Sequence, residues 1–358
     1  MTEQSSLPSM EGPVCPVPLP HKETIVMGHG SGGGMTQKLI RDIFTPYFSN
    51  PALDAGNDFA TLPIDAESGG ALIVSTDGHI VFPLFFPGGD IGRLAICGTV
   101  NDVAMSGARP LYLTASFILE EGLPVETLQR VLTSMRAAAE EAGVHIIAGD
   151  TKVVERGKAD GLFISTSGIG WLPEGRVIGG DCARPGDVVI VSGTIGDHGI
   201  AVLAERGELG FTAEVRSDVA PLNSLIQSVL AAAPDVHVLR DPTRGGLATT
   251  LNEIAVQSRV GIVLEETSIP VHGPVRAVCD MLGFDPLYVA NEGKVIILLP
   301  ANQAQAALEA LHQHPYGAEA VIIGKVAAEP AGRVLMRTEI GGTRILDVLA
   351  GEMLPRIC

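Results

Sequence analysis

Basic side chains are scarce in this sequence: 24 Lys and Arg stand against 41 Asp and Glu, which gives a formal net charge of −17. A chain of this charge repels polyanions, and no cluster of Lys and Arg marks a surface for a phosphate backbone. Apolar runs are short too, since stretches such as Val295–Leu299 fall far below the ~18 residues that span a bilayer. We therefore expect neither a nucleic acid nor a membrane as partner.

Cysteine is also rare, and its spacing excludes two classes of small stapled domain. The sequence has five cysteines and no Cys-x-x-Cys pair, which argues against a disulfide framework and against a structural zinc site. The histidines show no metal-ligand spacing. The N-terminal residues lack the basic stretch and apolar core of a signal peptide, so we expect a cytoplasmic protein. The five cysteines are Cys15, Cys97, Cys182, Cys279 and Cys358.

The length and the order of the apolar segments indicate more than one domain. At ~150 residues per domain, 358 residues correspond to about two to three. Apolar strands alternate with helical segments on both sides of a Pro-Gly-Asp turn at 185–187, which predicts an α/β (α+β) fold of two domains. We assign 1–22 to a flexible Pro-rich arm, 23–185 to an N-terminal domain and 186–330 to a C-terminal α/β domain. Residues 331–358 form a C-terminal segment that ends in a mobile tail.

The clearest single element is an amphipathic helix over Val125–Ala142. Its apolar stripe predicts that four side chains point inward, namely Leu128, Val131, Leu132 and Met135, and Gly143 follows as the cap. Similar patterns predict strands at 71–75, 111–117, 144–148, 162–165, 188–192, 261–265, 294–299 and 320–326, and helices at 91–105, 199–206, 222–232, 247–256 and 303–312.

A glycine cluster, Gly28–Gly34, follows a short apolar run at 24–27. It contains a G-x-G-x-x-G match, but a Rossmann unit continues promptly into a second strand, and here three prolines intervene. A phosphate-contacting loop and a plain flexible turn are the other two interpretations. No Walker A pattern occurs, so any bound nucleotide needs another device to hold its phosphates.

Five aspartates in glycine-rich or strand-end contexts could supply that device, because ligands gather beyond strand ends in α/β sheets. We expect Asp77 at the end of the strand at 71–75 and Asp150 at the end of the strand at 144–148. Carboxylates that converge without cationic partners repel one another, and Mg²⁺ bridging them to phosphate oxygens removes the repulsion. Each aspartate alone is as readily a helix cap or a turn residue. As a set they favour a metal site: Asp58, Asp77, Asp102, Asp150 and Asp241.

Three further charged residues stand beside glycines or strand termini. Lys152 and Glu292 are either a proton-transfer pair or a surface ion pair of little energetic worth. Arg244 precedes a glycine pair at a predicted helix N-terminus, where it either contacts phosphate or is simply solvated.

The last residue, Cys358, follows Pro355 on the predicted tail. Prenylation requires a cysteine four residues from the end, so it does not apply. A terminal thiol on a mobile segment can act as a nucleophile at several sites, or it is a chance terminal residue.

The motifs taken together resemble the HypE family of hydrogenase maturation proteins, over residues 24–358. The related aminoimidazole ribonucleotide and selenophosphate synthetases share the acidic nucleotide motifs but lack the terminal Pro-Arg-Ile-Cys. The motifs are GHGSGG, FFPGGDIGRLAICGTVNDVAMSGA (85–108), AGDTKVV (148–154), VSGTIGDHG (191–199), RDPTRGGL (240–247), NEGK (291–294) and PRIC.

The resemblance implies a homodimer formed through N-terminal mixed sheets, with ATP and Mg²⁺ in a cleft. It implies that a HypF carbamoyltransferase loads Cys358, that the S-carbamoyl group is dehydrated to a thiocyanate, and that a HypC–HypD complex accepts the cyanide for [NiFe]-hydrogenase. The implied metal ligands are Asp58, Asp77, Asp102 and Asp241. The implied nucleotide contacts are Gly30, Gly32, Gly33, Asn101, Asp150 and Arg244, and the implied catalytic residues are Cys358, Lys152 and Glu292.

Two other functions stay open. Another ATP-using synthetase of the same superfamily needs no terminal thiol, so trimming the last residues should leave its turnover intact. A non-catalytic scaffold that recruits partners through its tail predicts no ATP hydrolysis.

Overall fold

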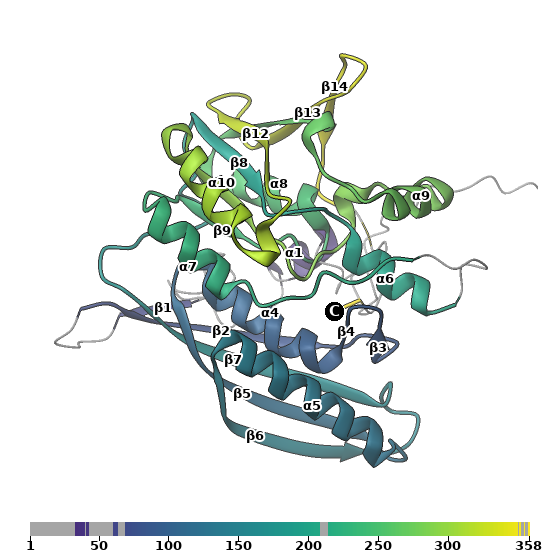
Figure 1. Ribbon diagram of the computed structural model, residues 1–358. Coiled ribbons are helices and arrows are strands. Elements are labelled where there is room, and N and C mark those ends of the chain that lie inside the picture. The colour runs from purple at the N-terminus through teal and green to yellow at the C-terminus, as the bar shows by residue number, and fades with distance from the viewer. Residues whose placement is uncertain are drawn as a thin grey trace, which may run out of the picture.

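The computed structural model describes residues 33–39, 41–42, 60–63, 69–207, 214–349, 351, 354 and 357–358. Within these ranges the chain forms two large sheets, of five and seven strands, with helices packed between them, and one two-stranded sheet (Figure 1). The predicted arm and the candidate residues Gly30, Gly32 and Asp58 lie outside the described ranges. The predicted α/β class is confirmed.

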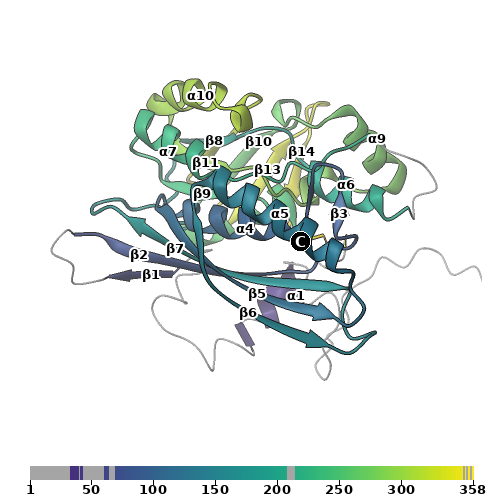
Figure 2. The ribbon, with the colours of Figure 1, turned by 60° about the horizontal axis from the view of Figure 1, so that its bottom comes forward.

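The N-terminal sheet has five strands in the order β1-β2-β7-β5-β6. It is mixed, as expected, because β5 and β6 run parallel whereas the other neighbours are antiparallel. Figure 2 shows the sheet from its lower side. The strands are β1 (Ala60–Pro63), β2 (Ala71–His79), β5 (Arg109–Glu120), β6 (His145–Val154) and β7 (Leu162–Leu172), and a short hairpin of β3 (Phe85–Phe86) and β4 (Gly89–Asp90) stands beside them.

Helix α4 (Ile91–Met105) lies between this sheet and the C-terminal domain and is confirmed over the predicted range. Asp90 caps it by accepting from the backbone N–H groups of Gly92 and Arg93. Almost every residue of the helix is buried, because it packs against the sheet on one side and the C-terminal domain on the other. This two-sided burial explains why the stretch is apolar all round.

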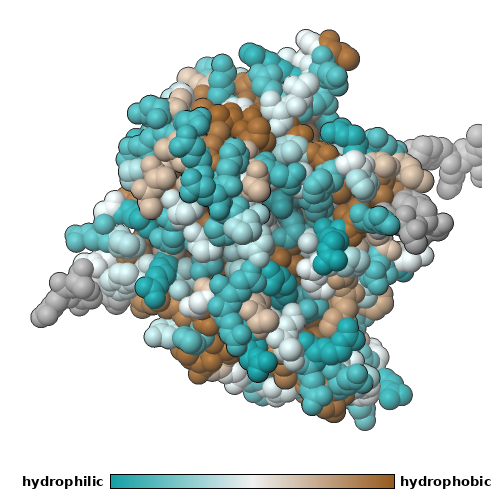
Figure 3. Space-filling model, in the orientation of Figure 1, coloured by the Kyte–Doolittle hydropathy of each residue, from teal (hydrophilic) through white to brown (hydrophobic). Residues whose placement is uncertain are grey.

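Helix α5 (Val125–Ala142) also matches the predicted range, and Gly143 ends it in the left-handed conformation with φ 67°. Val131 and Met135 are buried, but the prediction that Leu132 points inward is wrong, because its side chain is 42% exposed. The edge strand β6 is not covered by α5, so Leu132 lines an open groove between the two elements. Figure 3 shows hydrophobic patches on this domain, at the bottom of the view.

The C-terminal sheet has seven strands in the order β14-β13-β10-β12-β8-β11-β9. All its pairs are antiparallel except β10 with β13. The strands are β8 (Asp187–Val191), β9 (Val238–Arg240), β10 (Gly261–Glu265), β11 (Ile296–Pro300), β12 (Val321–Ala327), β13 (Arg333–Arg337) and β14 (Thr343–Leu346). The α-helices are α6 (Asp197–Glu205), α7 (Asn223–Ala232), α8 (Gly246–Ser258), α9 (Gly273–Leu282) and α10 (Ala304–His312), with 3₁₀ turns at Glu266–Ser268, Pro286–Tyr288, Ala301–Gln303 and Pro315–Gly317, and α1 (Gly34–Leu39) precedes them all.

The two domains share a core. Val103 and Met105 at the end of α4 pack in one cluster with Leu222 and Leu225 of the C-terminal domain. Because apolar side chains from both domains are removed from water together, the domains hold a defined relative position. Among the described residues no helix is long and apolar enough to cross a membrane.

Truncating Met135, on the buried stripe of α5, should destabilise the protein more than truncating its exposed neighbour Leu132. We expect Met135→Ala to lower the free energy of unfolding by about 2–5 kcal/mol, because the side chain is 1% exposed and leaves a cavity. Leu132→Ala, one turn away on the open side, is the matched control and should cost about 1 kcal/mol or less. Urea unfolding followed by circular dichroism measures both. Equal losses would contradict the assigned orientation of the helix.

Candidate active site

The C-terminal end of the chain is packed between the two domains, beside the β3–β4 hairpin and α6 (Figure 1). We call this inter-domain site the cleft. Leu354 and Ile357 are buried there in the same apolar cluster as residues of α4 and α6. The N–H of Ile80 donates to the main-chain oxygen of Cys358 at 3.2 Å. His198 binds the carbonyl oxygen of Ile357 through Nε2. Leu354, Ile357 and Cys358 are therefore docked in the structure. That the tail also leaves the cleft stays a prediction.

Three charged side chains act electrostatically on the Cys358 thiol, namely Arg244, Glu292 and Asp77, and Arg244 also forms a hydrogen bond with it. The pKa of the thiol is raised to about 12, chiefly by burial, while the Arg244 guanidinium lowers it and the two carboxylates contribute to the rise. The pKa of Arg244 is raised in turn, first by its contact with Cys358. A docked Cys358 is consequently a neutral thiol at physiological pH, and it becomes a good nucleophile only outside the cleft.

Glu292 is the most perturbed carboxyl group beside the thiol. Its side chain is 5% exposed, and Oε1 has no hydrogen-bond partner among the described residues. Burial raises the pKa of Glu292 well above its ordinary value, and Asp77, Asp241 and Asp218 add to the shift by repulsion. A carboxyl group tuned in this way can hold a proton near neutral pH and exchange it with a neighbour.

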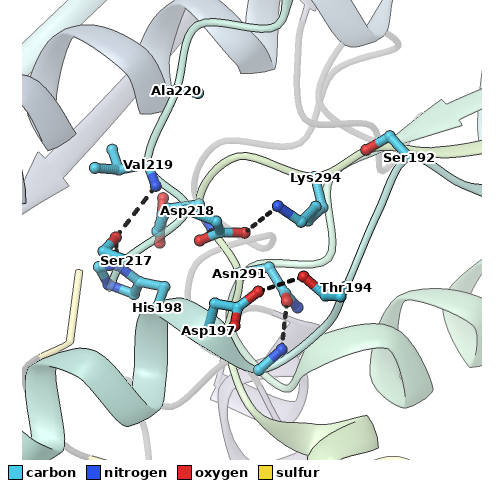
Figure 4. Close-up of polar contacts among 12 residues, drawn as sticks. Ser192, Thr194, Asp197, His198, Ser217, Asp218, Val219, Ala220, Asn291 and Lys294 are labelled. Atoms are coloured by element: carbon cyan, nitrogen blue, oxygen red, sulfur yellow. Dashed lines mark hydrogen bonds and ion pairs between the residues drawn. The ribbon is translucent and has the colours of Figure 1, made fainter. Parts of the chain in front are cut away.

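Asn291 joins the loops that carry the site (Figure 4). Its Oδ1 accepts from the N–H of Gly196 at 2.7 Å, and its Nδ2 donates to the carbonyl oxygen of Pro242 at 2.9 Å. The side chain is completely buried, so both bonds are protected from water. Asn291 therefore fixes three loops relative to one another: the loop before α6, the loop before α8 and the loop that contains Glu292.

Close backbone approach requires glycine at two positions in these loops. A Cβ on Gly246, which has φ 61°, would lie 2.6 Å from the carbonyl oxygen of Leu287. A Cβ on Gly293 would lie 1.8 Å from the carbonyl oxygen of Asp218. Both contacts are too short for any other residue, which explains the glycines of the two motifs.

Asp218 supports the Glu292 loop, and the sequence offered no signal for it, because it lies outside every motif. Its Oδ1 accepts from the N–H of Glu292 at 3.0 Å. Its Oδ2 lies 3.5 Å from Nζ of Lys294 (Figure 4). His198 belongs to a glycine-rich motif, but its spacing from other residues did not reveal its partner.

Asn101 and Asp102 of α4 are occupied by protein groups in the structure. Asn101 donates to the carbonyl oxygen of Ala220 at 3.0 Å and accepts from the N–H of Leu222 at 2.7 Å. Asp102 accepts from the hydroxyl of Ser75 at 2.7 Å. Asn101 thus fastens the segment that leads away from Asp218, and its role as a nucleotide contact stays a prediction.

The prediction that Asp77 and Asp150 follow strand ends is wrong, because β2 continues to His79 and β6 to Val154. The register also separates them. Asp77 pairs with buried Thr166 and therefore lies on the helix-covered face of the sheet. Asp150 pairs with Ser116, which belongs to the opposite face.

Lys152 shares the open face with Asp150, and its Nζ lies 2.6 Å from Oδ2 of that residue. Both side chains are more than half exposed. Three strand spacings of about 4.8 Å separate β6 from β2. Within one chain, the sheet therefore stands between Lys152 and the cleft that holds Glu292 and Cys358.

The oxygen-rich side of the cleft fits a hard divalent cation in its chemistry. Carboxylates are the ligands that Mg²⁺ prefers, and repulsion among Asp77, Asp241 and Glu292 is what a cation would relieve. Among the described residues, no group of three or more His, Cys, Asp or Glu is close enough to hold a metal ion. Asp58, the fourth predicted ligand, lies outside those residues.

Comparison with known proteins first defines the class. The AIR synthase related N-terminal domain matches residues 56–172, and the corresponding C-terminal domain matches residues 184–337. A thiamine monophosphate kinase from Aquifex aeolicus has a similar fold, with a TM-score of 0.62 at 20% identity. The chain is thus a two-domain protein of the AIR synthase related class.

More similar relatives place it within that class. The carbamoyl dehydratase HypE of Cupriavidus necator is 55% identical over 93% of this chain and 95% of its own. That of Escherichia coli K12 is 48% identical over 93% of this chain and 99% of its own. A HypE structure in complex with ATP has a TM-score of 0.78 at 52% identity, covering 94% of this chain and 100% of its own. The chain belongs to the HypE family of carbamoyl dehydratases.

Removal of the Glu292 charge should stabilise the protein in a pH-dependent way. A carboxyl group whose pKa is raised in the folded state loses stability as the pH rises above its unfolded pKa, because the unfolded chain releases the proton more readily. Glu292→Gln should therefore match the wild type near pH 4.5 and exceed it increasingly towards pH 8, by up to about 1.4 kcal/mol per pH unit.

Thermal unfolding across this pH range measures the difference. Glu155→Gln, at an exposed position, is the control and should show no widening gap. A constant difference between wild type and Glu292→Gln would contradict the raised pKa.

Proposed function

We propose that the protein dehydrates a carbamoyl group on its own Cys358 to a thiocyanate, at the expense of ATP. The observation that carries this proposal is the docking of Cys358 against Glu292 and Arg244. A substrate attached to the tail reaches this cleft without a bimolecular encounter, which supplies a high effective concentration. The similarity of this chain to a HypE that was solved in complex with ATP supports ATP as the nucleotide.

The reaction balances in two steps. The carbamoyl oxygen attacks the γ-phosphorus of ATP, ADP leaves with the electrons of the broken P–O bond, and the nitrogen loses one proton as a C=N bond forms. Phosphate then leaves the carbon with the electrons of the C–O bond, and the nitrogen loses its second proton, which yields S–C≡N. The elements of water end in phosphate and the released proton.

Glu292 is the proposed base for the nitrogen proton. Its raised pKa makes it a stronger base than an ordinary carboxylate, and it lies within electrostatic reach of the sulfur that would carry the substrate. Arg244 is positioned to stabilise charge on the carbamoyl oxygen. Asp77, Asp102 and Asp241 would hold Mg²⁺, which supplies neutralisation of phosphate charge when bound.

The tail has a second task away from the cleft. The neutral docked thiol is a poor acceptor, so loading by HypF and transfer to HypC–HypD both require the tail to leave. A HypE has been solved in complex with HypF, with a TM-score of 0.81 at 49% identity, covering 87% of this chain and 99% of its own. We propose the same carbamoyl donor here, and the cytoplasm as the location.

A homodimer formed through the open face of the N-terminal sheet completes the proposal. Apolar side chains stand on this face, among them Tyr112 and Ile118, which are 43% and 40% exposed. Lys152 lies on the same face, on β6 at the edge of the sheet. We propose that it serves the cleft of a second copy, which it would reach past the edge of the partner's sheet.

The proposed reaction can be followed directly by the mass of the C-terminal peptide. After loading by HypF and addition of Mg-ATP, mass spectrometry of residues 353–358 should show the carbamoyl adduct lose one water. Glu292→Gln should slow this loss by about 10²–10⁴-fold while carbamoylation proceeds. Cys358→Ala should show no adduct yet still bind ATP, whereas Cys182→Ser, the control, should behave as wild type. ATP turnover that survives Cys358→Ala would favour a synthetase, and a stable adduct in the wild type would favour a scaffold.

Mixing of two inactive variants tests the position of Lys152. If Lys152 acts across the dimer, Lys152→Ala mixed with Glu292→Gln should recover about one quarter of wild-type turnover, because half of the random dimers contain one intact site. If both residues act in one chain, the mixture stays inactive. Light scattering confirms the dimer in each sample, and a monomer would overturn this part of the proposal.

A further inference from the structure

His198 is the described side chain that contacts the tail backbone most directly. It lies in the first turn of α6 and is completely buried. Its Nε2 bonds to the carbonyl oxygen of Ile357, the residue before the reactive cysteine. Its Nδ1 lies 2.8 Å from the hydroxyl oxygen of Ser217 (Figure 4). The ring of Phe86 packs edge-on against it at 5.5 Å between centroids, which fixes the plane of the imidazole.

The partners determine the direction of these hydrogen bonds. A carbonyl oxygen only accepts, so Nε2 carries the hydrogen that bonds to Ile357. Burial lowers the pKa of His198, and the neutral ring leaves a lone pair on Nδ1 for the Ser217 hydroxyl. Ser217 accepts in turn from the N–H of Val219 at 3.1 Å. A continuous chain of donors therefore runs from the 217–219 segment to the tail.

The same segment holds the catalytic loop. Asp218, the residue after Ser217, accepts from the backbone N–H of Glu292. The tail carbonyl and the Glu292 backbone are thus fixed by two consecutive residues of one segment. We propose that His198 is a positioning residue that latches the tail so that the Cys358 substituent meets Glu292. This inference rests on the proposed function, since it is the dehydration step that the latch would serve.

Substitution of His198 by Gln or by Asn distinguishes the two hydrogen bonds that the imidazole makes. Gln places its amide nitrogen near the position of Nε2 and can still donate to the Ile357 carbonyl, whereas Asn reaches only the Ser217 side. We expect His198→Asn to raise the rate at which iodoacetamide alkylates Cys358 in the absence of ATP by about tenfold, and His198→Gln to stay within about twofold of wild type. Endoproteinase Glu-C releases residues 353–358 for mass spectrometry.

The same digest contains the folding control. Cys97 and Cys279 are buried in the body of the protein and should stay unreacted in every folded variant. His312→Gln, which removes a ring whose Nε2 bonds to the Ala320 carbonyl far from the tail, should leave Cys358 at the wild-type rate. If the buried cysteines react in His198→Asn, the test passes to Ser217→Ala. We expect Ser217→Ala to raise the rate of Cys358 alkylation about threefold.

If Cys358 is alkylated at the wild-type rate in folded His198→Asn, or in Ser217→Ala, the proposed latch is contradicted. This readout needs neither ATP nor a carbamoyl donor, so it is independent of the proposed reaction. In single-turnover dehydration we expect His198→Asn to lose about tenfold in rate with unchanged ATP affinity, and His198→Gln to recover most of it. If the wild-type protein does not dehydrate the carbamoyl group while its docked Cys358 is still protected from iodoacetamide, the proposed function is contradicted but the proposed role of His198 is not.

Discussion

One buried amide holds the active-site region together. Asn291 bonds to Gly196 and Pro242, so three loops that are distant in the sequence are fixed to one another by a side chain that water cannot reach. Loss of such a group leaves both backbone partners unsatisfied in the interior, which is costly. The position of Glu292, the next residue, follows from this arrangement.

The cleft accumulates negative charge against the usual preference of protein interiors. Asp77, Asp241 and Asp218 lie within electrostatic reach of Glu292, and Arg244 opposes their effect on it. The consequences are a carboxyl group inclined to keep its proton and a thiol that stays neutral when docked. Under the proposed function, the same electrostatic environment strengthens Glu292 as a base and weakens Cys358 as a nucleophile while it is docked, so loading and dehydration would take place at different positions of the tail.

The N-terminal sheet divides its polar residues between two faces. Alternation along β2 directs Asp77 towards the cleft, while alternation along β6 directs Asp150 and Lys152 to the open side. One chain therefore presents two chemically distinct surfaces, one that receives its own tail and one that carries a basic and an acidic side chain among apolar neighbours.

The sequence by itself determined the class, the long elements and the motifs. Helices α4 and α5 were predicted over their full ranges because their periodicity and caps are local properties. Strand lengths were underestimated, since polar residues such as Asp77 and Asp150 continue strands through pairing with distant partners. Only the tertiary structure decided which sheet faces Asp77 and Asp150 occupy, that Leu132 stays exposed, and that His198 contacts Ile357. These depend on register, on the extent of helix cover and on contacts between segments more than 100 residues apart, which no local pattern encodes.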